Sequence, residues 1–570
     1  MEEKKQERVK LWDELPGYDL IEEIDFPLFP SWFLAGTHSI PPWTPLFGYH
    51  FIRFCSHGTK FATNQLSIPT CKGWEQRYRD GGLYNAFIIV RDEKEIAERT
   101  AKFREALRFW LENFDKEWVG YKKELLGIYS KLRELDIQNA SNHQLHHHNY
   151  EMMLASKRMW EIHHIGMYAT FSAWVLLEEI CRERFGIRDQ DPEFQDMVRG
   201  FDNKLYEMEK RLWELGQIAI EMKLDSIFKD YETEKIKEKL HESEKGRDWY
   251  KRFTQYLETD EVGGWRMRRA HDLNEPYWLE DPETPLGVVK NYILKGTEYN
   301  LDQIRKDLIK RRESAMTSFL QKVSEPERPF FETLIRLAGK ASSYSEEHDL
   351  YCELMLHAHL RRGYLAIGKR LAEKGTIDRP DDVFMLNPDE IDRVAMVPEA
   401  HDLRYITRRR RSAWEEWQNR PNPPLITNRS SFEEAVVKDM LPSKDAIAMK
   451  VVVGEMPSPK PQIKADIFGI CGSAGESVGK ARIINKYLDL KDVQPGEIIV
   501  CPAVNPTWTV VFGYINGVIC ESGGTLSHAA IISREYGIPA IINAFHATEK
   551  IKTGQRVRID ATHGAIDILE

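Results

Sequence analysis

A histidine at the predicted start of a helix, His528, is the residue whose surroundings point most clearly to chemistry. Gly523 and Gly524 precede it and permit backbone angles that are costly for other residues. Residues 529–536 then form a predicted helix that ends at Gly537. The amino end of a helix attracts a phosphate dianion and disfavours imidazolium, so the ring is expected to stay neutral and nucleophilic. The pattern therefore predicts a histidine that can accept a phosphoryl group.

Residues around this histidine carry groups that can bind a phosphate. Thr525 and Ser527 have hydroxyls that can cap the unpaired N–H groups of the first helical turn. The residues predicted to support the phosphate are Gly524, Thr525, Ser527 and Arg534. The alternative is a capped surface histidine that takes part in no reaction.

Several short motifs in the last hundred residues occur in a fixed order. They lie at residues 472–475, 479–482, 495–500, 505–508, 523–528, 534–539, 554–560 and 564. In this order they resemble the phosphohistidine swivelling domain of phosphoenolpyruvate (PEP) synthase, pyruvate phosphate dikinase and rifamycin phosphotransferase. One departure is Ala474, where that family usually has proline. The resemblance implies an α/β domain in which His528 becomes phosphorylated.

The chain of 570 residues is long enough for several domains. The expected fold class is multidomain α + α/β, with a mostly helical acceptor domain followed by the swivelling domain. The predicted parts are an aromatic- and proline-rich N-terminal segment packing on the acceptor domain (1–95), the helical acceptor domain (96–440), a proline-rich linker (441–466) and the swivelling domain (467–570). Three prolines between Met456 and Lys464 predict a stiff tether about which the last domain can rotate.

Composition excludes several classes of partner. The net charge of −10 argues against general nucleic-acid binding, which needs a positive surface. No apolar run approaches the length of a membrane span, and the first residues have no signal-peptide core. Seven scattered cysteines form neither a disulfide framework nor a CxxC pair. A cytoplasmic protein with reduced thiols and no membrane partner is therefore expected.

A site that could load the histidine is not recognisable in the sequence. Residues 474–481 imitate a P-loop, but Ala474 replaces its first glycine and Ala481 replaces the hydroxyl residue that reaches Mg²⁺. Nothing resembles the ATP-grasp domain or the PEP-binding barrel of the family. We therefore expect Mg²⁺ and ATP to bind to an ATP-grasp subunit on a separate chain, with no cofactor held tightly by this one.

Two further stretches resemble relatives of the same superfamily. Residues 346–349, 361–371 and 382–386 look like the substrate domain of rifamycin phosphotransferase-like proteins. Residues 37–45, which include His38, look like the start of the large subunit of phenylphosphate synthase. That resemblance implies a phosphohistidine subunit that passes its phosphoryl group to a phenol. The alternatives are another hydroxyl compound, including an antibiotic, and a carrier or regulatory protein without an acceptor pocket.

One predicted helix could form an aromatic acceptor pocket. Its face is formed by Trp160, His164, Met167, Phe171 and Trp174. These residues recur at helical spacing, so they share one side. A phenol would need such a surface and one base, for which His163 and His164 are candidates. The alternative is that the stripe is ordinary core.

A second predicted helix offers a different base. His357 could take the proton, and Arg361 could steady the transferring phosphoryl group, with Glu347 on an adjacent strip. His38 is a further candidate from the N-terminal resemblance. The alternative is a buried, satisfied histidine and a surface ion pair.

Two runs of like residues carry weaker signals. The triple His146–His148 does not predict a metal site, because adjacent residues do not converge on one ion. The run Arg408–Arg411 could meet phosphates or an acidic partner, or it could be a solvated helix surface. No metal site is therefore predicted on this chain.

Overall fold

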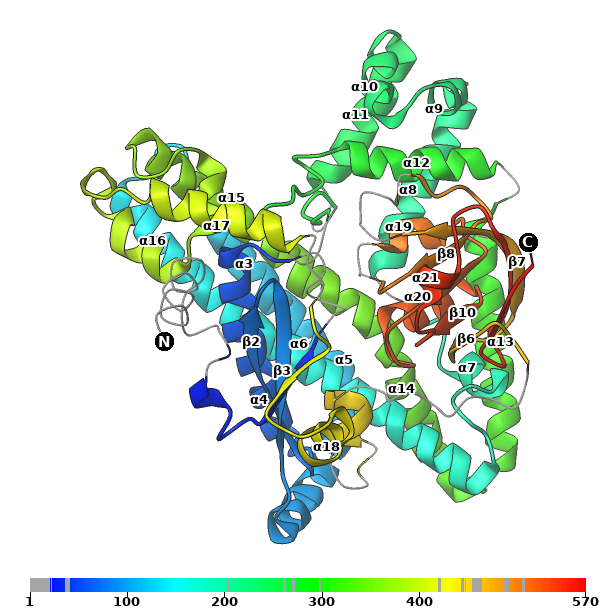
Figure 1. The fold of residues 1–570 in the computed structure, drawn as a ribbon. Coiled ribbons are helices and arrows are strands. Elements are labelled where there is room, and N and C mark those ends of the chain that lie inside the picture. Colours follow the sequence, from blue (N-terminus) through cyan, green and yellow to red (C-terminus); the bar gives the residue numbers. More distant parts are fainter. Residues whose placement is uncertain are drawn as a thin grey trace.

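The computed structural model describes residues 21–569 except 22, 36–41, 203, 260–262, 269–271, 297–298, 419–421, 442–444, 446, 454–463, 485–489, 491 and 505–507. His38 and the prolines of the predicted linker lie outside the described residues. Figure 1 shows a long helical body with a small sheet beside it. The C-terminal domain packs against the body on the side away from that sheet. No helix in the described part of the chain combines the length and apolar character needed to cross a bilayer.

A four-stranded sheet lies beside the first helices, in the order β2–β3–β1–β4. Its strands are β1 (Ser31–Leu34), β2 (Cys71–Arg79), β3 (Gly82–Ile89) and β4 (Leu425–Thr427). The β2–β3 hairpin turns at Asp80 and Gly81, which both have positive φ, as a tight hairpin requires. Strand β4 comes from the segment predicted as helical and pairs antiparallel with β1. The chain therefore returns to its N-terminal sheet before the C-terminal domain begins.

The helical body is built around α6 (Asn142–Ile180), whose C-terminal half is buried on almost all sides. Ser141 begins this helix in a capping box, in which its hydroxyl accepts from the N–H of Gln144 and the Gln144 side chain accepts from the N–H of Ser141. Helices α4, α5, α14 and α15 pack against it. The helices before α14 are α3 (Pro45–His50), α4 (Ser56–Gln65), α5 (Glu93–Glu134), α7 (Pro192–Met197), α8 (Lys204–Glu221), α9 (Asp225–Asp230), α10 (Thr233–His241), α11 (Glu244–Thr259), α12 (Glu283–Lys295) and α13 (Leu301–Lys322). The later ones are α14 (Arg328–His348), α15 (Met355–Glu373), α16 (Pro388–Ala395), α17 (Arg404–Trp417) and α18 (Phe432–Ala435).

A π-helical segment, Asp349–Leu354, joins α14 to α15 without a loop. Such segments widen a helix locally and are frequent at functional sites. Here the segment is buried along its whole length, so its polar side chains face the interior of the protein.

The C-terminal domain is an eight-stranded mixed sheet in the order β5–β12–β11–β7–β8–β9–β10–β6. Its strands are β5 (Ile467–Phe468), β6 (Ile470–Ser473), β7 (Glu476–Ile483), β8 (Ile498–Cys501), β9 (Gly517–Cys520), β10 (Ala540–Ile542), β11 (Arg556–Asp560) and β12 (Ala565–Ile568), and its helices are α19 (Thr509–Phe512), α20 (His528–Tyr536) and α21 (Ala547–Lys550). Strands β7 to β10 run parallel to one another, and the other pairings are antiparallel. The predicted class, multidomain α + α/β, is confirmed. Most of the P-loop-like stretch lies in β7, where an extended backbone cannot wrap around a phosphate.

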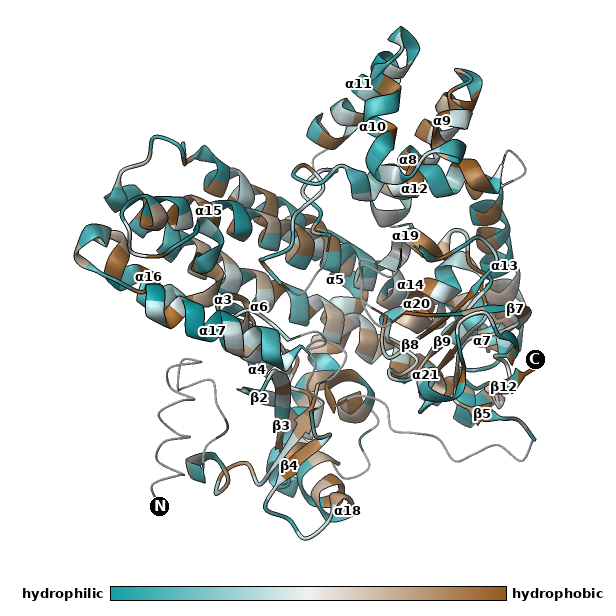
Figure 2. Cartoon of the chain, turned by 45° about the horizontal axis from the view of Figure 1, so that its top comes forward, coloured by the Kyte–Doolittle hydropathy of each residue, from teal (hydrophilic) through white to brown (hydrophobic). Residues whose placement is uncertain are grey.

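The buried hydrophobic residues of this domain belong to two clusters. One lies within the domain and is formed by residues such as Ile498, Val500 and Ile559. The other joins the residues of α20, among them Ile531 and Ile532, to the core of the helical body. Figure 2 shows the hydrophobic strands β8 and β9 beside α20 and α14. Helix α20 is therefore one of the elements through which the domain packs on the body, where it contacts α14.

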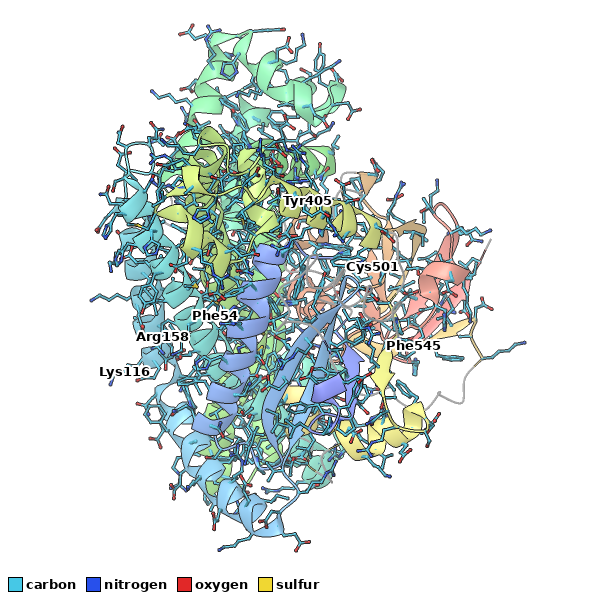
Figure 3. All side chains as sticks on the ribbon, turned by 60° about the vertical axis from the view of Figure 1, so that its left-hand side comes forward. Phe54, Lys116, Arg158, Tyr405, Cys501 and Phe545 are labelled. Atoms are coloured by element: carbon cyan, nitrogen blue, oxygen red, sulfur yellow. The ribbon has the colours of Figure 1, made fainter. Side chains whose placement is uncertain are left out.

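Figure 3 shows Lys116 and Arg158 projecting from the outer side of the long helices, whereas Cys501 lies inside the C-terminal sheet. All seven cysteines are buried and none forms a disulfide.

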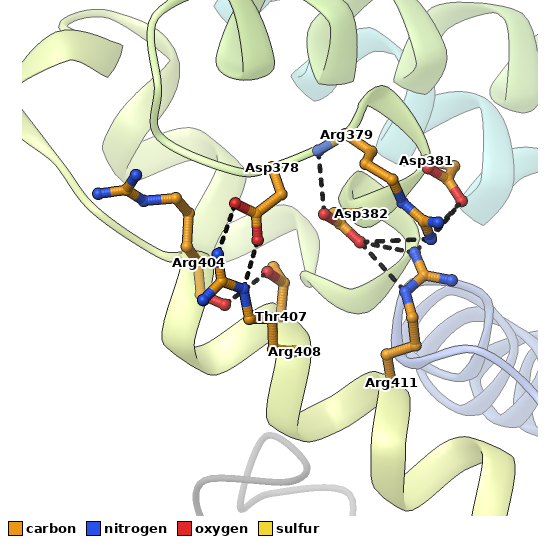
Figure 4. A network of polar contacts seen from close by, with 8 residues as sticks. All are labelled: Asp378, Arg379, Asp381, Asp382, Arg404, Thr407, Arg408 and Arg411. Atoms are coloured by element: carbon orange, nitrogen blue, oxygen red, sulfur yellow. Dashed lines mark hydrogen bonds and ion pairs between the residues drawn. The ribbon is translucent and has the colours of Figure 1, made fainter.

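The arginine run on α17 pairs with nearby acidic residues. Arg408 Nε lies 2.6 Å from Asp378 Oδ2, and Arg411 Nη2 lies 2.7 Å from Asp382 Oδ1 (Figure 4). Arg410 is buried and bonds the carboxylate of Glu390. These ion pairs attach α17 to the preceding segment of the chain, so the arginine run has a structural role.

Candidate functional site

His528 is the first residue of α20, directly after its N-cap, Ser527. Gly523 has φ of 103°, and a Cβ there would lie 2.7 Å from Ser527 Oγ, so only glycine fits this turn. The helix ends at Gly537, whose φ of 66° is left-handed. The structure thus has the local geometry expected from the sequence, with a histidine at the mouth of a helix that follows a glycine turn.

Two buried carboxylates of the helical body face His528. Its Nδ1 lies 3.3 Å from Asp349 Oδ2 and 3.6 Å from Glu346 Oε1. Both carboxylates are almost fully buried, whereas 24% of the His528 side chain is exposed. The C-terminal domain therefore docks with its histidine against the end of α14.

The charge of His528 differs from the sequence-based expectation. Burial lowers the pKa of the ring, but Asp349, Glu346 and, more weakly, Glu353 raise it to about 9. The expected neutral ring is therefore wrong for this docked arrangement. The helix dipole is a local effect, and whole negative charges from the helical body outweigh a partial charge at the end of a helix. Burial also raises the pKa of Glu346 and of Asp349, while His528 acts in the opposite direction.

A cavity of about 260 Å³ lies between His528 and the body. Its apolar walls include Phe51, Trp74, Trp160, Met167, Phe171 and Leu526. Its polar lining includes Gln76, Asn85, His163, His164, His348, Asp349, Glu353 and His528. The lining comes from the N-terminal sheet and the π-helical turn at residues 51–55, from α6, from the end of α14 with the π-helical segment after it, and from the loop before α20. Parts of the chain that are distant in sequence thus form one site.

Most of the aromatic stripe predicted on α6 lines this cavity. Trp160, His164, Met167 and Phe171 contribute to its wall. Trp174 does not line it, because its ring packs against the guanidinium of Arg534 at 4.9 Å. The stripe is therefore a cavity wall over three turns and a support for the C-terminal domain in the fourth.

The floor of the cavity is a chain of close polar contacts. His163 Nε2 lies 2.9 Å from Glu353 Oε1 and 3.1 Å from His348 Nε2. His348 Nε2 in turn lies 3.3 Å from Asp349 Oδ1. His348 Nδ1 donates to the carbonyl of Tyr344 at 2.8 Å, so Nε2 of this ring carries a lone pair when the ring is neutral. Burial, with His163 beside it, holds the pKa of His348 well below its usual value.

His164 faces the cavity but makes a different set of contacts. Its Nδ1 bonds the carbonyl of Trp160 at 2.9 Å, and its Nε2 lies 3.9 Å from Cys55 Sγ. Of the two adjacent base candidates, His163 is therefore the one that reaches the carboxylates.

The candidates on and before α15 do not reach the cavity. Glu347 accepts a hydrogen bond from the indole of Trp118, and Arg361 is paired with Glu280 at 2.7 Å. His357 is buried, with an aromatic ring packed edge-on against it. These three residues have structural roles here, and His38 lies outside the described residues.

The residues predicted to support the phosphate separate into two groups. Arg534 is buried and donates to the carbonyls of Gly472 and Thr525 at 2.8 and 2.7 Å, so it holds the loop from behind. Ser527 makes no side-chain cap, and its Oγ is buried without a hydrogen-bond partner among the described residues. That hydroxyl, directly before the first residue of α20, can therefore still bond a phosphoryl oxygen.

Sequence reasoning missed the acidic and imidazole groups of the floor. Glu346, Asp349 and Glu353 are spaced three and four residues apart, which places side chains on one side of a helix. His348 falls in the same stretch. That spacing is a usable signal, whereas Glu347 and His357 do not line the cavity.

Comparisons with known proteins match two parts of the chain that contribute to this site. Residues 493–564 match the family described as PEP-utilising enzyme, mobile domain, and residues 162–346 match the rifampicin phosphotransferase fourth domain. An uncharacterised phosphotransferase of Bacillus subtilis, YvkC, is 29% identical over 383 residues, which is 67% of this chain and 44% of that protein. A rifampicin phosphotransferase of Streptomyces sviceus is 28% identical over 319 residues, 54% of this chain and 33% of that one. Chondramide synthase of Chondromyces crocatus is 28% identical over 459 residues, 78% of this chain and 11% of that one. The chain thus spans less than half the length of each of these relatives.

Proposed function

Because the chain is related to the PEP-utilising enzymes, rifampicin phosphotransferase among them, we propose that it transfers a phosphoryl group through His528 to a hydroxyl compound. The observation that carries this proposal is the position of His528 over a cavity of about 260 Å³ with an aromatic wall. A phosphohistidine in this place would face an acceptor held against α6.

The carboxylates around His528 suit the departure of its phosphoryl group. With Nδ1 held against Asp349 and Glu346, the proposed site of phosphorylation is Nε2. A proton kept on Nδ1 lets the ring leave as neutral imidazole when the N–P bond breaks. The raised pKa of His528, about 9, indicates that these carboxylates favour that proton. Phosphoryl transfer depends mainly on such positioning and on charge stabilisation.

The acceptor must lose a proton as its oxygen attacks phosphorus. His163 lines the cavity, and its Nε2 contacts the carboxylate of Glu353 at 2.9 Å. We assign the proton to this pair, because a histidine oriented by a carboxylate is a common general base. The new O–P bond, the broken N–P bond and the proton on the pair balance the reaction.

The size of the cavity favours a small aromatic acceptor. Pockets for drug-sized ligands are about 300–1,000 Å³, and this one lies below that range. A single phenolic ring would be enclosed by Phe51, Trp160 and Phe171, with its hydroxyl toward His163. A phenol is therefore the first candidate, as in phenylphosphate synthase. A larger hydroxyl compound such as an antibiotic is the second, supported by the similarity to rifampicin phosphotransferases.

We place the loading reaction on another protein. The P-loop-like stretch of the sequence lies largely in strand β7, so it offers no cradle for ATP. The proposed donor is Mg²⁺ with ATP on a separate ATP-grasp protein, in the cytoplasm. The partner protein would then have to contact His528 in order to phosphorylate it.

Exchange between phenol and phenyl phosphate tests the transfer half-reaction without that partner. The full chain is incubated with ¹⁴C-phenol and unlabelled phenyl phosphate, and label in phenyl phosphate is measured over time. We expect exchange with the wild type and none with His528→Ala. Exchange that survives this substitution, or no exchange with phenol or with a panel of larger hydroxyl compounds and their phosphates, would refute the proposed function.

A further inference from the structure

We propose that the floor of the cavity binds one divalent transition-metal ion, Zn²⁺ or Mn²⁺, through His163, His348 and Asp349. One atom from each of these buried side chains lies within 4.8 Å of the other two. This departs from the prediction that the chain binds no metal, which considered only the adjacent histidines 146–148.

The spacing of the floor atoms fits a coordination sphere. Two ligands bonded to one ion at about 2.1 Å, with about 90–110° between them, lie about 3.0–3.4 Å apart. Nε2 of His163 and Nε2 of His348 are 3.1 Å apart, and Nε2 of His348 and Oδ1 of Asp349 are 3.3 Å apart. Glu353 Oε1, 2.9 Å from His163 Nε2, is placed to be a fourth ligand. Small movements of these side chains would place one ion among all four atoms.

Hydrogen bonds alone account poorly for the same contacts. His348 donates from Nδ1 to the carbonyl of Tyr344, which leaves a lone pair on its Nε2. The single Nε2–H that His163 can offer would then have to serve both this lone pair and Glu353. A histidine whose other nitrogen is fixed by a backbone carbonyl is the usual arrangement of an imidazole ligand. A cation removes the competition, because it accepts both nitrogen lone pairs at once.

The ligand types select the class of ion. Imidazole nitrogens favour Zn²⁺ and neighbouring transition metals, whereas Mg²⁺ prefers an all-oxygen shell. A mixed set of two imidazoles and one or two carboxylates therefore suits Zn²⁺ or Mn²⁺. Asp349 would bridge the ion and the carrier, since its Oδ1 faces His348 and its Oδ2 faces His528.

The role of this ion rests on the proposed function, whereas its binding does not. A phosphoryl group on Nε2 brings about two negative charges to a ring whose Nδ1 already faces the buried carboxylates of Asp349 and Glu346. A divalent ion at Asp349 would offset that charge and polarise the acceptor hydroxyl. Coordination would occupy Nε2 of His163, so in the metal-bound protein the carboxylate of Glu353, rather than His163, would take the acceptor's proton. The test must therefore measure binding directly, apart from transfer.

Calorimetric titration of the metal-stripped full chain with ZnCl₂, MnCl₂ or MgCl₂ makes that measurement. We expect one equivalent of Zn²⁺ or Mn²⁺ to bind and Mg²⁺ to bind far more weakly. His163→Gln and Asp349→Asn should each weaken binding by about 10- to 100-fold or more. Visible absorption of bound Co²⁺ should change in both variants, and circular dichroism verifies that they fold.

Three control variants distinguish an ion on the cavity floor from an ion bound elsewhere on the chain. His164→Gln alters the neighbouring ring in the same cavity and should leave the dissociation constant unchanged. His147→Asn removes an exposed histidine that could bind Zn²⁺ adventitiously and should also have no effect. His528→Ala should bind the ion at least as tightly as the wild type, because the carrier is not a ligand.

Three results would overturn the metal site: no saturable binding, equal binding by His163→Gln and wild type, or loss of binding only in His147→Asn. Failure of phenol exchange with intact metal binding would instead overturn the proposed function. Phenol exchange without metal binding would instead support the proposed transfer reaction and overturn the metal site.

Discussion

Replacing Asp349 by asparagine should lower the pKa of His528 and slow phosphoryl transfer. Asp349 Oδ2 is the carboxylate oxygen nearest to Nδ1, at 3.3 Å, and its charge makes the largest contribution that raises the pKa of the ring. Asparagine keeps the shape of the side chain and removes its charge. Removing that charge should lower the pKa from about 9 toward the ordinary 6.5 or below, because only Glu346 and, more weakly, Glu353 then act against burial.

The size of the effect follows from that difference in pKa. A rise from 6.5 to about 9 corresponds to about 3 kcal/mol in favour of imidazolium. Because the folded pKa is raised, this stabilisation is fully present below pH 6.5 and is lost as pH rises through about 9. We expect single-turnover transfer from the phosphohistidine to phenol at pH 8 to slow roughly 10- to 100-fold in Asp349→Asn, which corresponds to losing about half or more of that energy.

Hydrogen–deuterium exchange at the imidazole Cε1, followed by mass spectrometry at a series of pH values, measures the pKa of each histidine in a chain of this size. Glu347→Gln is the matched control, because Glu347 adjoins Glu346 in sequence and bonds Trp118 on another face of the helix. This control should leave the pKa of His528 unchanged. A wild-type pKa near 6.5, or a pKa that stays near 9 in Asp349→Asn, would refute the docked ion pair.

Three further substitutions test the positioning of the site. Arg534→Lys loses part of the paired hydrogen bonding to two backbone carbonyls and should cost roughly 2–3 kcal/mol of stability, measured by chemical denaturation; an unchanged midpoint would contradict its role as a clamp. Glu535→Gln breaks a buried ion pair with Arg305 across the domain contact and should release the C-terminal domain, seen as a larger radius of gyration in X-ray scattering; unchanged scattering would count against this contact. Phe171→Ala enlarges the cavity, so the KM for phenol should rise while bulkier phenols become better acceptors; a uniform loss for all acceptors would place the acceptor elsewhere.

The sequence was sufficient where the structure depends on local chain geometry. The glycine turn, the helix beginning at His528 and its end at Gly537 all follow from neighbouring residues. The surroundings of His528 could not be obtained in this way, since Asp349 lies about 180 residues earlier and reaches the ring through domain packing. The expectation of a neutral ring failed for this reason.

The identity of the inward-facing residues was harder to predict than the helices that carry them. A π-helical segment begins at Asp349 and changes which side chains face the cavity. Glu347 precedes this segment and His357 follows it, and neither of these predicted substrate-site residues lines the cavity. The domain boundaries remain predictions, although β4 shows that residues 425–427 belong to the N-terminal sheet.

Charge couples the chemistry of His528 to the position of its domain. Without a phosphoryl group, Asp349 and Glu346 raise the pKa of the ring to about 9, so their attraction for its proton favours the docked position. A phosphoryl group reverses the local charge, and the loaded domain would meet two buried carboxylates with a dianion. A divalent ion on the floor of the cavity would offset that repulsion, because it would lie beside Asp349, which faces His528. On the proposed function, the metal site would therefore govern whether the loaded domain docks, and the carboxylates alone would favour docking after transfer.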